Sequence, residues 1–189
     1  MKKVFILNGV GTVGKGKFVE FISKYIPTFK YSIADLPKEA ATVLGWNGGK
    51  AEKDRKFLSD IVDLATEYND APFQDVVSIV TDFKNNKIET NVLFIDMRDP
   101  KDIARAVEIF GAETILIRNP NVRKIVSNHA DRDVENYKYD YIIENDGTLE
   151  QLENVAEFFV REIICWSDIP GNDRPLVLTC SKYWGGTWI

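Results

Sequence analysis

The sequence contains few of the residues from which metal and redox sites are commonly built. It has one histidine, His129, and two cysteines, Cys165 and Cys180, which lie near the C-terminus and belong to no C-x-x-C motif or His/Cys cluster. This pattern argues against a zinc or dithiol redox motif, and we expect both cysteines to be reduced thiols. A lone histidine is more often a surface hydrogen-bonding residue than a catalyst, so we assign His129 no role.

The sequence also lacks an excess of positive charge and a long apolar run at its N-terminus. Its 24 lysines and arginines are outnumbered by 29 aspartates and glutamates, which gives a net charge of -5. This balance argues against a protein that coats nucleic acid, so any basic site must be local. The apolar stretch at residues 4–7 is too short for a signal peptide or a membrane span. We therefore expect a cytoplasmic protein with no nucleic-acid or membrane partner.

Short apolar runs alternate with amphipathic segments along the chain, which predicts an α/β fold with a mainly parallel sheet covered by helices on both faces. The expected strands are residues 3–7, 29–35, 91–96, 113–118 and 139–145. Residues 37–85 have a helical pattern with a break at 69–72. Thr148 and Gln151 form a capping-box pattern ahead of a last amphipathic helix.

The stretch ILNGVGTVGKGKF, which begins in the first expected strand, contains two overlapping nucleotide-binding motifs. Gly9, Gly11 and Gly14 match the G-x-G-x-x-G of a dinucleotide fold, in which an acidic residue about 20 positions further on, here Asp35, binds a ribose hydroxyl. Gly9, Gly14 and Lys15 match the G-x-x-x-x-G-K of a phosphate loop, in which backbone N–H groups surround an anion and the lysine reaches the outer phosphates. In a third interpretation, the glycines only make a tight turn between a strand and a helix.

Charged residues follow the later strands in an order that favours the phosphate loop. Asp96 and Arg98 end the third expected strand, Arg118 ends the fourth, and Arg132 lies beyond it. Together with the loop, this order resembles the P-loop nucleoside monophosphate kinases, and most closely the deoxynucleoside monophosphate (dNMP) kinases of bacteriophages, over residues 3–162. The segment EKDRKFLSDIVDLATEYNDAPF is similar to the acceptor-side helical region of that family.

The resemblance implies a three-layer P-loop kinase fold in a domain of residues 1–164. A helical NMP-binding region would occupy about residues 36–85, and a lid about residues 118–138. Residues 165–189 fall outside the resemblance and contain three of the four tryptophans. We expect this C-terminal extension to pack against the body of the protein or against a second copy in a homodimer.

The reaction implied by the resemblance is transfer of the γ-phosphate of ATP to a dNMP, with Mg²⁺, giving ADP and a dNDP. ATP and the dNMP would then be the small-molecule partners, in the host cytoplasm if the protein is encoded by a phage. Such a reaction requires no histidine base, because the attacking oxygen of the monophosphate is already ionised at neutral pH.

The same resemblance implies a role for individual residues. The catalytic residues would be Lys15, Arg98, Arg118 and Arg132. The ATP phosphates would contact Gly9, Gly11, Thr12, Val13, Gly14, Lys15 and Gly16. The acceptor would contact Asp35, Arg55 and Arg98. Asp96 would bind the metal ion through water.

Residue 16 departs from the phosphate-loop pattern, which usually has Ser or Thr after the lysine as a ligand for Mg²⁺. Gly16 offers no such ligand, so the metal would depend on Asp96 or Asp35 acting through water. Three alternatives therefore stay open. They are another small P-loop kinase with a different phosphorylated acceptor, an NAD(P)-binding oxidoreductase, and a nucleotide-binding module without turnover.

Overall fold

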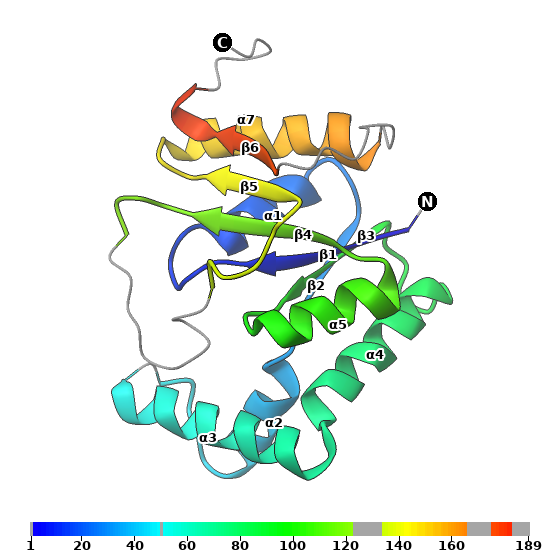
Figure 1. The fold of residues 1–189 in the computed structure, drawn as a ribbon, viewed down its shortest axis with the longest axis vertical. Coiled ribbons are helices and arrows are strands. Elements are labelled where there is room, and N and C mark those ends of the chain that lie inside the picture. Colours follow the sequence, from blue (N-terminus) through cyan, green and yellow to red (C-terminus); the bar gives the residue numbers. More distant parts are fainter. Residues whose placement is uncertain (1, 50, 123–133, 166–174, 183–189) are drawn as a thin grey trace.

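Six short strands form one sheet in the part of the chain that the computed structural model describes, residues 2–49, 51–122, 134–165 and 175–182. They are β1 (Lys3–Asn8), β2 (Thr28–Ser32), β3 (Val92–Asp96), β4 (Glu113–Arg118), β5 (Tyr141–Glu144) and β6 (Leu176–Thr179). All neighbouring strands run parallel, in the order β2-β3-β1-β4-β5-β6. Their carboxyl ends therefore meet at one edge of the sheet, toward which the arrowheads in Figure 1 point.

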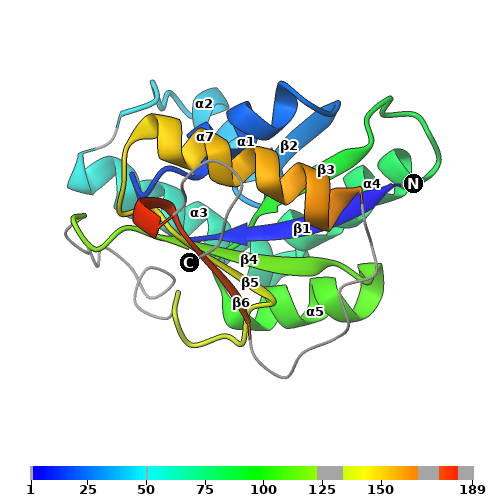
Figure 2. The same cartoon turned by 90° about the horizontal axis from the view of Figure 1, so that it is seen from above.

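Helices cover both faces of the sheet (Figures 1 and 2). They are α1 (Lys15–Ser23), α2 (Asp35–Val43), α3 (Glu52–Asn69), α4 (Ala71–Lys84), α5 (Pro100–Phe110), α7 (Leu149–Phe158), the π-helical turn η1 (Phe159–Ile164) and the 3₁₀ turn η2 (Cys180–Lys182). The helices α1 and α7 lie on one face, while α4 and α5 pack on the other. The prediction of a three-layer α/β fold with a mainly parallel sheet is confirmed. Within the described residues, none of the helices combines the length and apolar composition needed to cross a membrane.

The central strand β1 is buried on both faces of the sheet. This burial is the reason why its sequence does not alternate between apolar and polar residues. Phe5 and Leu7 are buried in the core under α1 and α7, whereas Val4 and Ile6 are buried in the core under α4 and α5. Successive side chains of a strand point to opposite faces, so a strand covered on both faces must be apolar throughout. Phe159 in η1 contacts the Phe5 ring at 5.4 Å between ring centroids, which attaches the last helix to β1.

The helical pattern of residues 37–85 resolves into α2, α3 and α4, with the predicted break at Asp70, whose φ of 57° is left-handed. Arg105 of α5 attaches this region to the rest of the domain, because its guanidinium stacks on Phe73 at 3.7 Å and pairs with Asp70 at 2.5 Å. No residue of α3 is buried. The apolar stripe along this helix is incompletely covered, and Leu64 and Tyr68 are 68% and 83% exposed.

One strand boundary and one helix differ from the sequence-based expectation. The second strand ends at Ser32 rather than at Asp35, because the Asp35 carboxylate accepts a hydrogen bond from the Ser32 backbone N–H at 2.9 Å and begins α2. The helix α5 was missed, although Asp99 caps it by accepting from the Lys101 N–H and Pro100 occupies its first turn. The capping box of Thr148 and Gln151 is present as predicted.

Part of the segment assigned to a C-terminal extension belongs to the sheet. The strand β6 pairs with β5, with Leu176 opposite Tyr141, and Leu178 and Cys180 are buried in the core under α1 and α7. Within this segment, the short apolar run Leu176–Leu178 forms most of the strand that completes the sheet. Three tryptophans, Trp166, Trp184 and Trp188, lie outside the described residues.

The two cysteines provide a test of this packing. Burial raises the pKa of the Cys180 thiol to about 12, whereas Cys165 is exposed. At pH 8 only about one Cys180 thiol in ten thousand would be ionised, and the thiolate is the reactive form. We expect iodoacetamide to modify Cys165 in the native protein and to leave Cys180 unmodified, as measured by peptide mass spectrometry. Both should react in guanidinium chloride, and rapid native modification of Cys180 would contradict the burial of its side chain in the core.

Candidate functional site

Two glycines determine the path of the loop between β1 and α1. Gly9 has a φ of 142° and its backbone lies so close to β4 that an added Cβ would overlap the carbonyl oxygen of Ile117. Gly14 has a φ of 104°, and a Cβ there would lie 2.5 Å from the Nδ2 atom of Asn145. Neither position can accept a side chain without strain, because both the space and the backbone conformation favour glycine.

Gly11 and Gly16, unlike Gly9 and Gly14, have open space where a Cβ would lie. A Cβ built at either residue has no other described heavy atom within 4 Å, apart from its immediate neighbours. The loop therefore requires glycine at positions 9 and 14, whereas position 11 has open space for a side-chain Cβ. The space beside Gly16 therefore accommodates a Cβ atom.

The strand order argues against the dinucleotide interpretation. In dinucleotide-binding folds β2 lies beside β1, which places the acidic residue after β2 near the bound ribose. Here β3 lies between β2 and β1. The Asp35 carboxylate is also held locally, by the Ser32 N–H and by the Lys38 ammonium at 2.7 Å.

The beginning of α1 has the properties of an anion site. Gly14 occupies its N-cap without a side-chain hydrogen bond to the helix, and the first turn contains no acidic residue. The first N–H groups of the helix are therefore left without a side-chain cap, and the helix dipole adds positive potential there. Thr12 also has a left-handed φ, 68°, as is typical of loops whose N–H groups form an anion nest.

Lys15 places a positive charge directly on this loop. Its ammonium donates hydrogen bonds to the carbonyl oxygens of Gly9 and of Val10, the latter at 3.1 Å. The side chain thus folds back over the loop from the first residue of α1. A bound anion would lie between this ammonium and the N–H groups of the loop.

Asn145, directly after β5, contacts the loop near Gly14. The sequence pattern did not predict this contact. The Asn145 side chain donates a hydrogen bond to the Val13 carbonyl oxygen at 2.9 Å, and its backbone N–H donates to the Arg118 carbonyl at 2.8 Å. Val13 itself is buried in the core. The only sequence signal for this contact was the position of Asn145 directly after an apolar strand.

Arg118 is the last residue of β4 and lies opposite Glu144 of β5. Its Nε donates to Glu144 Oε1 at 2.8 Å, and its Nη2 contacts the same oxygen. This hydrogen-bonded pair raises the pKa of Arg118. The two side chains are 43% and 21% exposed, so the pair is accessible to a ligand.

A cavity of about 370 Å³ joins Arg118 to the loop. Its lining comes from the loop, from the chain on either side of residues 123–133 and from the end of β5: Val10, Val13, Leu116, Ile117, Arg118, Asn119, Pro120, Val122, Val134, Glu135 and Glu144. The structure therefore brings Lys15 and Arg118, which are 103 positions apart in the sequence, to the same edge of the sheet.

The remaining predicted residues are more dispersed. Arg98 is half-buried and follows the end of β3 at the same edge of the sheet as the loop. Arg55 is exposed in the first turn of α3. Arg132 lies outside the described residues.

The two carboxylate oxygens of Asp96 have different surroundings. Its Oδ2 pairs with the Lys30 ammonium at 2.7 Å, while its Oδ1 is buried and has no hydrogen-bond partner among the described residues. In the described part of the chain, no group of three or more His, Cys, Asp or Glu side chains is arranged so that it could hold a metal ion. These residues fit a hydrated Mg²⁺ held mainly by its phosphate ligands, with one water bound by Asp96.

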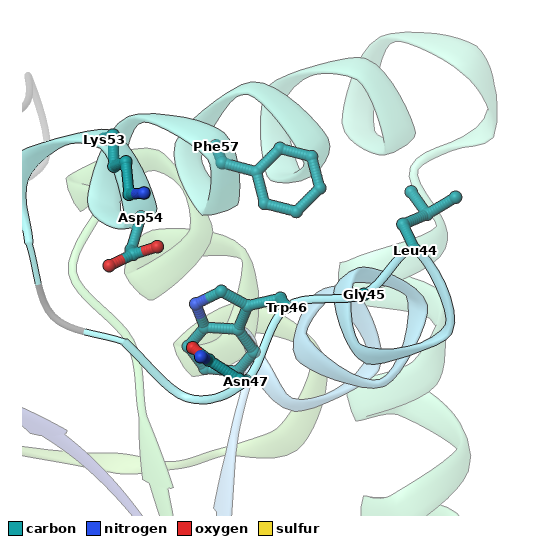
Figure 3. Close-up of a pocket in the computed structure, with 7 residues that line it drawn as sticks. All are labelled: Leu44, Gly45, Trp46, Asn47, Lys53, Asp54 and Phe57. Atoms are coloured by element: carbon teal, nitrogen blue, oxygen red, sulfur yellow. The ribbon is translucent and has the colours of Figure 1, made fainter.

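A second cavity, of about 330 Å³, lies between the end of α2 and the beginning of α3 (Figure 3). It is lined by Leu44, Gly45, Trp46, Asn47, Lys53, Asp54 and Phe57. The Trp46 indole and the Phe57 ring come from the two sides of this cavity. The Trp46 N–H is buried and has no partner among the described residues. The cavity thus has an aromatic ring on each of two sides.

No protein-family model and no curated protein sequence matches the chain. Among solved structures, a shikimate kinase from Aquifex aeolicus is 12% identical, with a TM-score of 0.43 over 83% of this chain and 95% of that one. A sugar kinase from Janibacter sp. is 11% identical, with a TM-score of 0.42 over 85% and 95% of the two chains. A GTPase from Pyrococcus abyssi is 10% identical, with a TM-score of 0.44 over 97% and 92%. Likenesses at these identities and TM-scores carry no information about the site residues of this chain.

The loop geometry predicts unequal effects of alanine at its glycines. Gly9→Ala should lower the free energy of unfolding by about 2 kcal/mol or more, because it combines a steric overlap with a positive φ. Gly11→Ala should change it by less than about 0.5 kcal/mol, because its Cβ enters open space. Urea denaturation of the two variants measures the difference. Equal losses would show that the loop does not pack against β4 as described.

Proposed function

We propose that this protein is a P-loop kinase that transfers the γ-phosphate of ATP to a deoxynucleoside monophosphate. The observation that carries the proposal is the loop itself. It joins a central strand to an uncapped helix, requires glycine at both ends, and holds Lys15 against its backbone. Backbone N–H groups and a lysine in this arrangement match the chemistry of a nucleoside triphosphate.

The residues at this edge of the sheet would supply positive charge where phosphoryl transfer needs it. The transferring phosphoryl group carries negative charge on its equatorial oxygens, and fixed cations stabilise that charge. Lys15 and the N–H groups of the loop would hold the ATP phosphates, and Arg98 would hold the acceptor phosphate. Arg118 and Arg132 would approach the transferring group, where a guanidinium can bind two oxygens at once.

Magnesium would be held chiefly by the phosphates and water, with Asp96 accepting from a bound water molecule. When bound, Mg²⁺ neutralises phosphate charge during transfer. Gly16 contributes no ligand, and this absence distinguishes the loop from those with Ser or Thr after the lysine.

Two features support a nucleotide on each side of the reaction. The cavity of about 370 Å³ beside the loop gives room for more than a phosphate chain. On the acceptor side, the cavity that contains Trp46 and Phe57 favours a substrate with an aromatic ring over an aliphatic phosphorylated metabolite. Asp35 and Arg55 are further acceptor-side candidates.

A nucleotide-binding module without turnover is the second candidate function. It is favoured by the absence of a hydroxyl at Gly16 and by the ion pair of Arg118 with Glu144, which occupies a proposed catalytic guanidinium. Such a module would bind ATP and form no product.

The test is release of ADP from Mg-ATP with dAMP, dGMP, dCMP or dTMP offered separately. We expect turnover with at least one of them and a loss of about 100-fold or more in Lys15→Ala, because one preorganised charge is removed from the site. Lys17→Ala is the matched control, since Lys17 is exposed and pairs with Glu20. Gly16→Thr should fold normally and raise turnover by adding a hydroxyl ligand.

The outcomes separate the candidates. If the wild type is silent and Gly16→Thr is active, residue 16 disables an otherwise intact kinase. If both are silent while ATP still binds, the protein is a binding module. Turnover that survives Lys15→Ala would contradict the proposed role of the loop.

The ion pair between Glu144 and Arg118 leads to a prediction for ATP binding. Glu144→Gln should release Arg118 from its ion pair and remove a negative charge from the cavity, which should tighten ATP binding several-fold. Glu113→Gln is the control, because Glu113 lies at the opposite end of β4. Isothermal titration of both variants with ATP makes the comparison. Unchanged or weaker binding in Glu144→Gln would show that Arg118 does not contact the phosphates.

A further inference from the structure

A buried hydrogen-bond network connects the beginning of the loop with two other parts of the chain. Asn8, the last residue of β1, is fully buried, and its Oδ1 accepts a hydrogen bond from the Gly9 N–H at 2.7 Å. Its Nδ2 donates to the Tyr139 hydroxyl at 2.7 Å and to the Arg98 carbonyl oxygen at 3.3 Å. One amide group thus contacts the loop, the chain after β3 and the chain before β5.

Tyr139 completes this network. Its side chain is buried, and its hydroxyl donates to the Val134 carbonyl oxygen at 2.6 Å while accepting from Asn8. Burial raises the pKa of Tyr139, so the hydroxyl keeps its proton at neutral pH and remains a donor. The Tyr137 ring packs edge-on against it at 5.4 Å between centroids.

The orientation of the Asn8 amide depends on the tyrosine hydroxyl. Without that hydroxyl, Nδ2 would keep only its longer contact with the Arg98 carbonyl oxygen, and the Val134 carbonyl oxygen would lose a donor. Buried polar groups in such networks depend on one another, because an unsatisfied member costs more than a lost surface contact. Rotation of the Asn8 amide would move the acceptor of the Gly9 N–H.

We propose that Tyr139 is a positioning residue for the loop site and acts through Asn8. It holds the Gly9 N–H and the backbone at Arg98 in one geometry, so that the loop and the arginine for the acceptor stay aligned. The catalytic consequence rests on the proposed function. The effect of Tyr139 on the orientation of the Gly9 N–H is independent of the proposed function.

The chain offers a matched control two residues away. The Tyr141 hydroxyl also donates to one oxygen, that of the Glu113 carboxylate. Tyr141 and Glu113 are the first residues of β5 and β4, at the edge of the sheet opposite the loop. Tyr→Phe at either position removes one hydroxyl from a packed ring, but only Tyr139 contacts Asn8.

The experiment compares Tyr139→Phe with Tyr141→Phe in the full chain. Both should unfold cooperatively in urea, with the larger loss of stability in Tyr139→Phe, because Asn8 and the Val134 carbonyl oxygen both lose a buried partner. Only Tyr139→Phe should shift the Gly9 amide resonance in a ¹H–¹⁵N spectrum and speed its hydrogen exchange. With Mg-ATP and a dNMP, only Tyr139→Phe should lower kcat, by about tenfold, with less than a twofold change in the KM for ATP. In an Asn8→Ala background, Tyr139→Phe should cause no further loss of kcat.

The readouts distinguish a failure of this inference from a failure of the proposed function. A Gly9 resonance that is unchanged, or that shifts equally in both variants, overturns the positioning role. An equal loss of kcat in the two variants, or a further loss in the Asn8→Ala background, overturns its catalytic consequence. If no variant turns over but the Gly9 resonance shifts only in Tyr139→Phe, the kinase proposal fails and the positioning of the loop stands.

Discussion

The close approach of the glycine loop to β4 and β5 is the contact on which the rest of the site depends. Gly9 lies against the Ile117 carbonyl and Gly14 against the Asn145 amide, so the loop cannot move outward without losing both contacts. Val13, between these glycines, is buried in the same core as α1 and α7. The packing of the sheet thereby determines the direction of the first N–H groups of α1, and with it where an anion can bind.

The positive charges of the site are held against partners within the protein. Lys15 contacts loop carbonyls, Arg118 pairs with Glu144, and Lys30 pairs with Asp96. Under the proposed function, a phosphate that binds Lys15 or Arg118 would replace the acceptor that each cation contacts here. Such partly exposed pairs contribute little to stability, so their exchange costs little. This arrangement reconciles a local cationic site with a net charge of -5.

The helical region between β2 and β3 is attached unevenly, because α4 packs in the core whereas α3 does not. Its helix α3 has no buried residue, and Arg105 connects the beginning of α4 to α5 through Asp70 and Phe73. Elements with few buried apolar contacts open at lower free energy than core elements. Under the proposed function, α3 would adjust to the acceptor while the loop beside β1 keeps its shape.

Local patterns in the sequence were sufficient for much of the fold, because they depend on neighbouring residues. Apolar runs predicted five strands, the capping box of Thr148 and Gln151 predicted the start of α7, and the glycine motif predicted a strand-to-helix turn with Lys15 at its end. The tertiary structure decided what depends on residues far apart in the chain. It determined the strand order that argues against a dinucleotide site, the need for Gly9 and Gly14 but not Gly11, and the pairing of Arg118 with Glu144. It also joined Asn8 to Tyr139 across 131 positions. Periodicity and propensity contain no information on such contacts, because these are determined by which strands lie side by side.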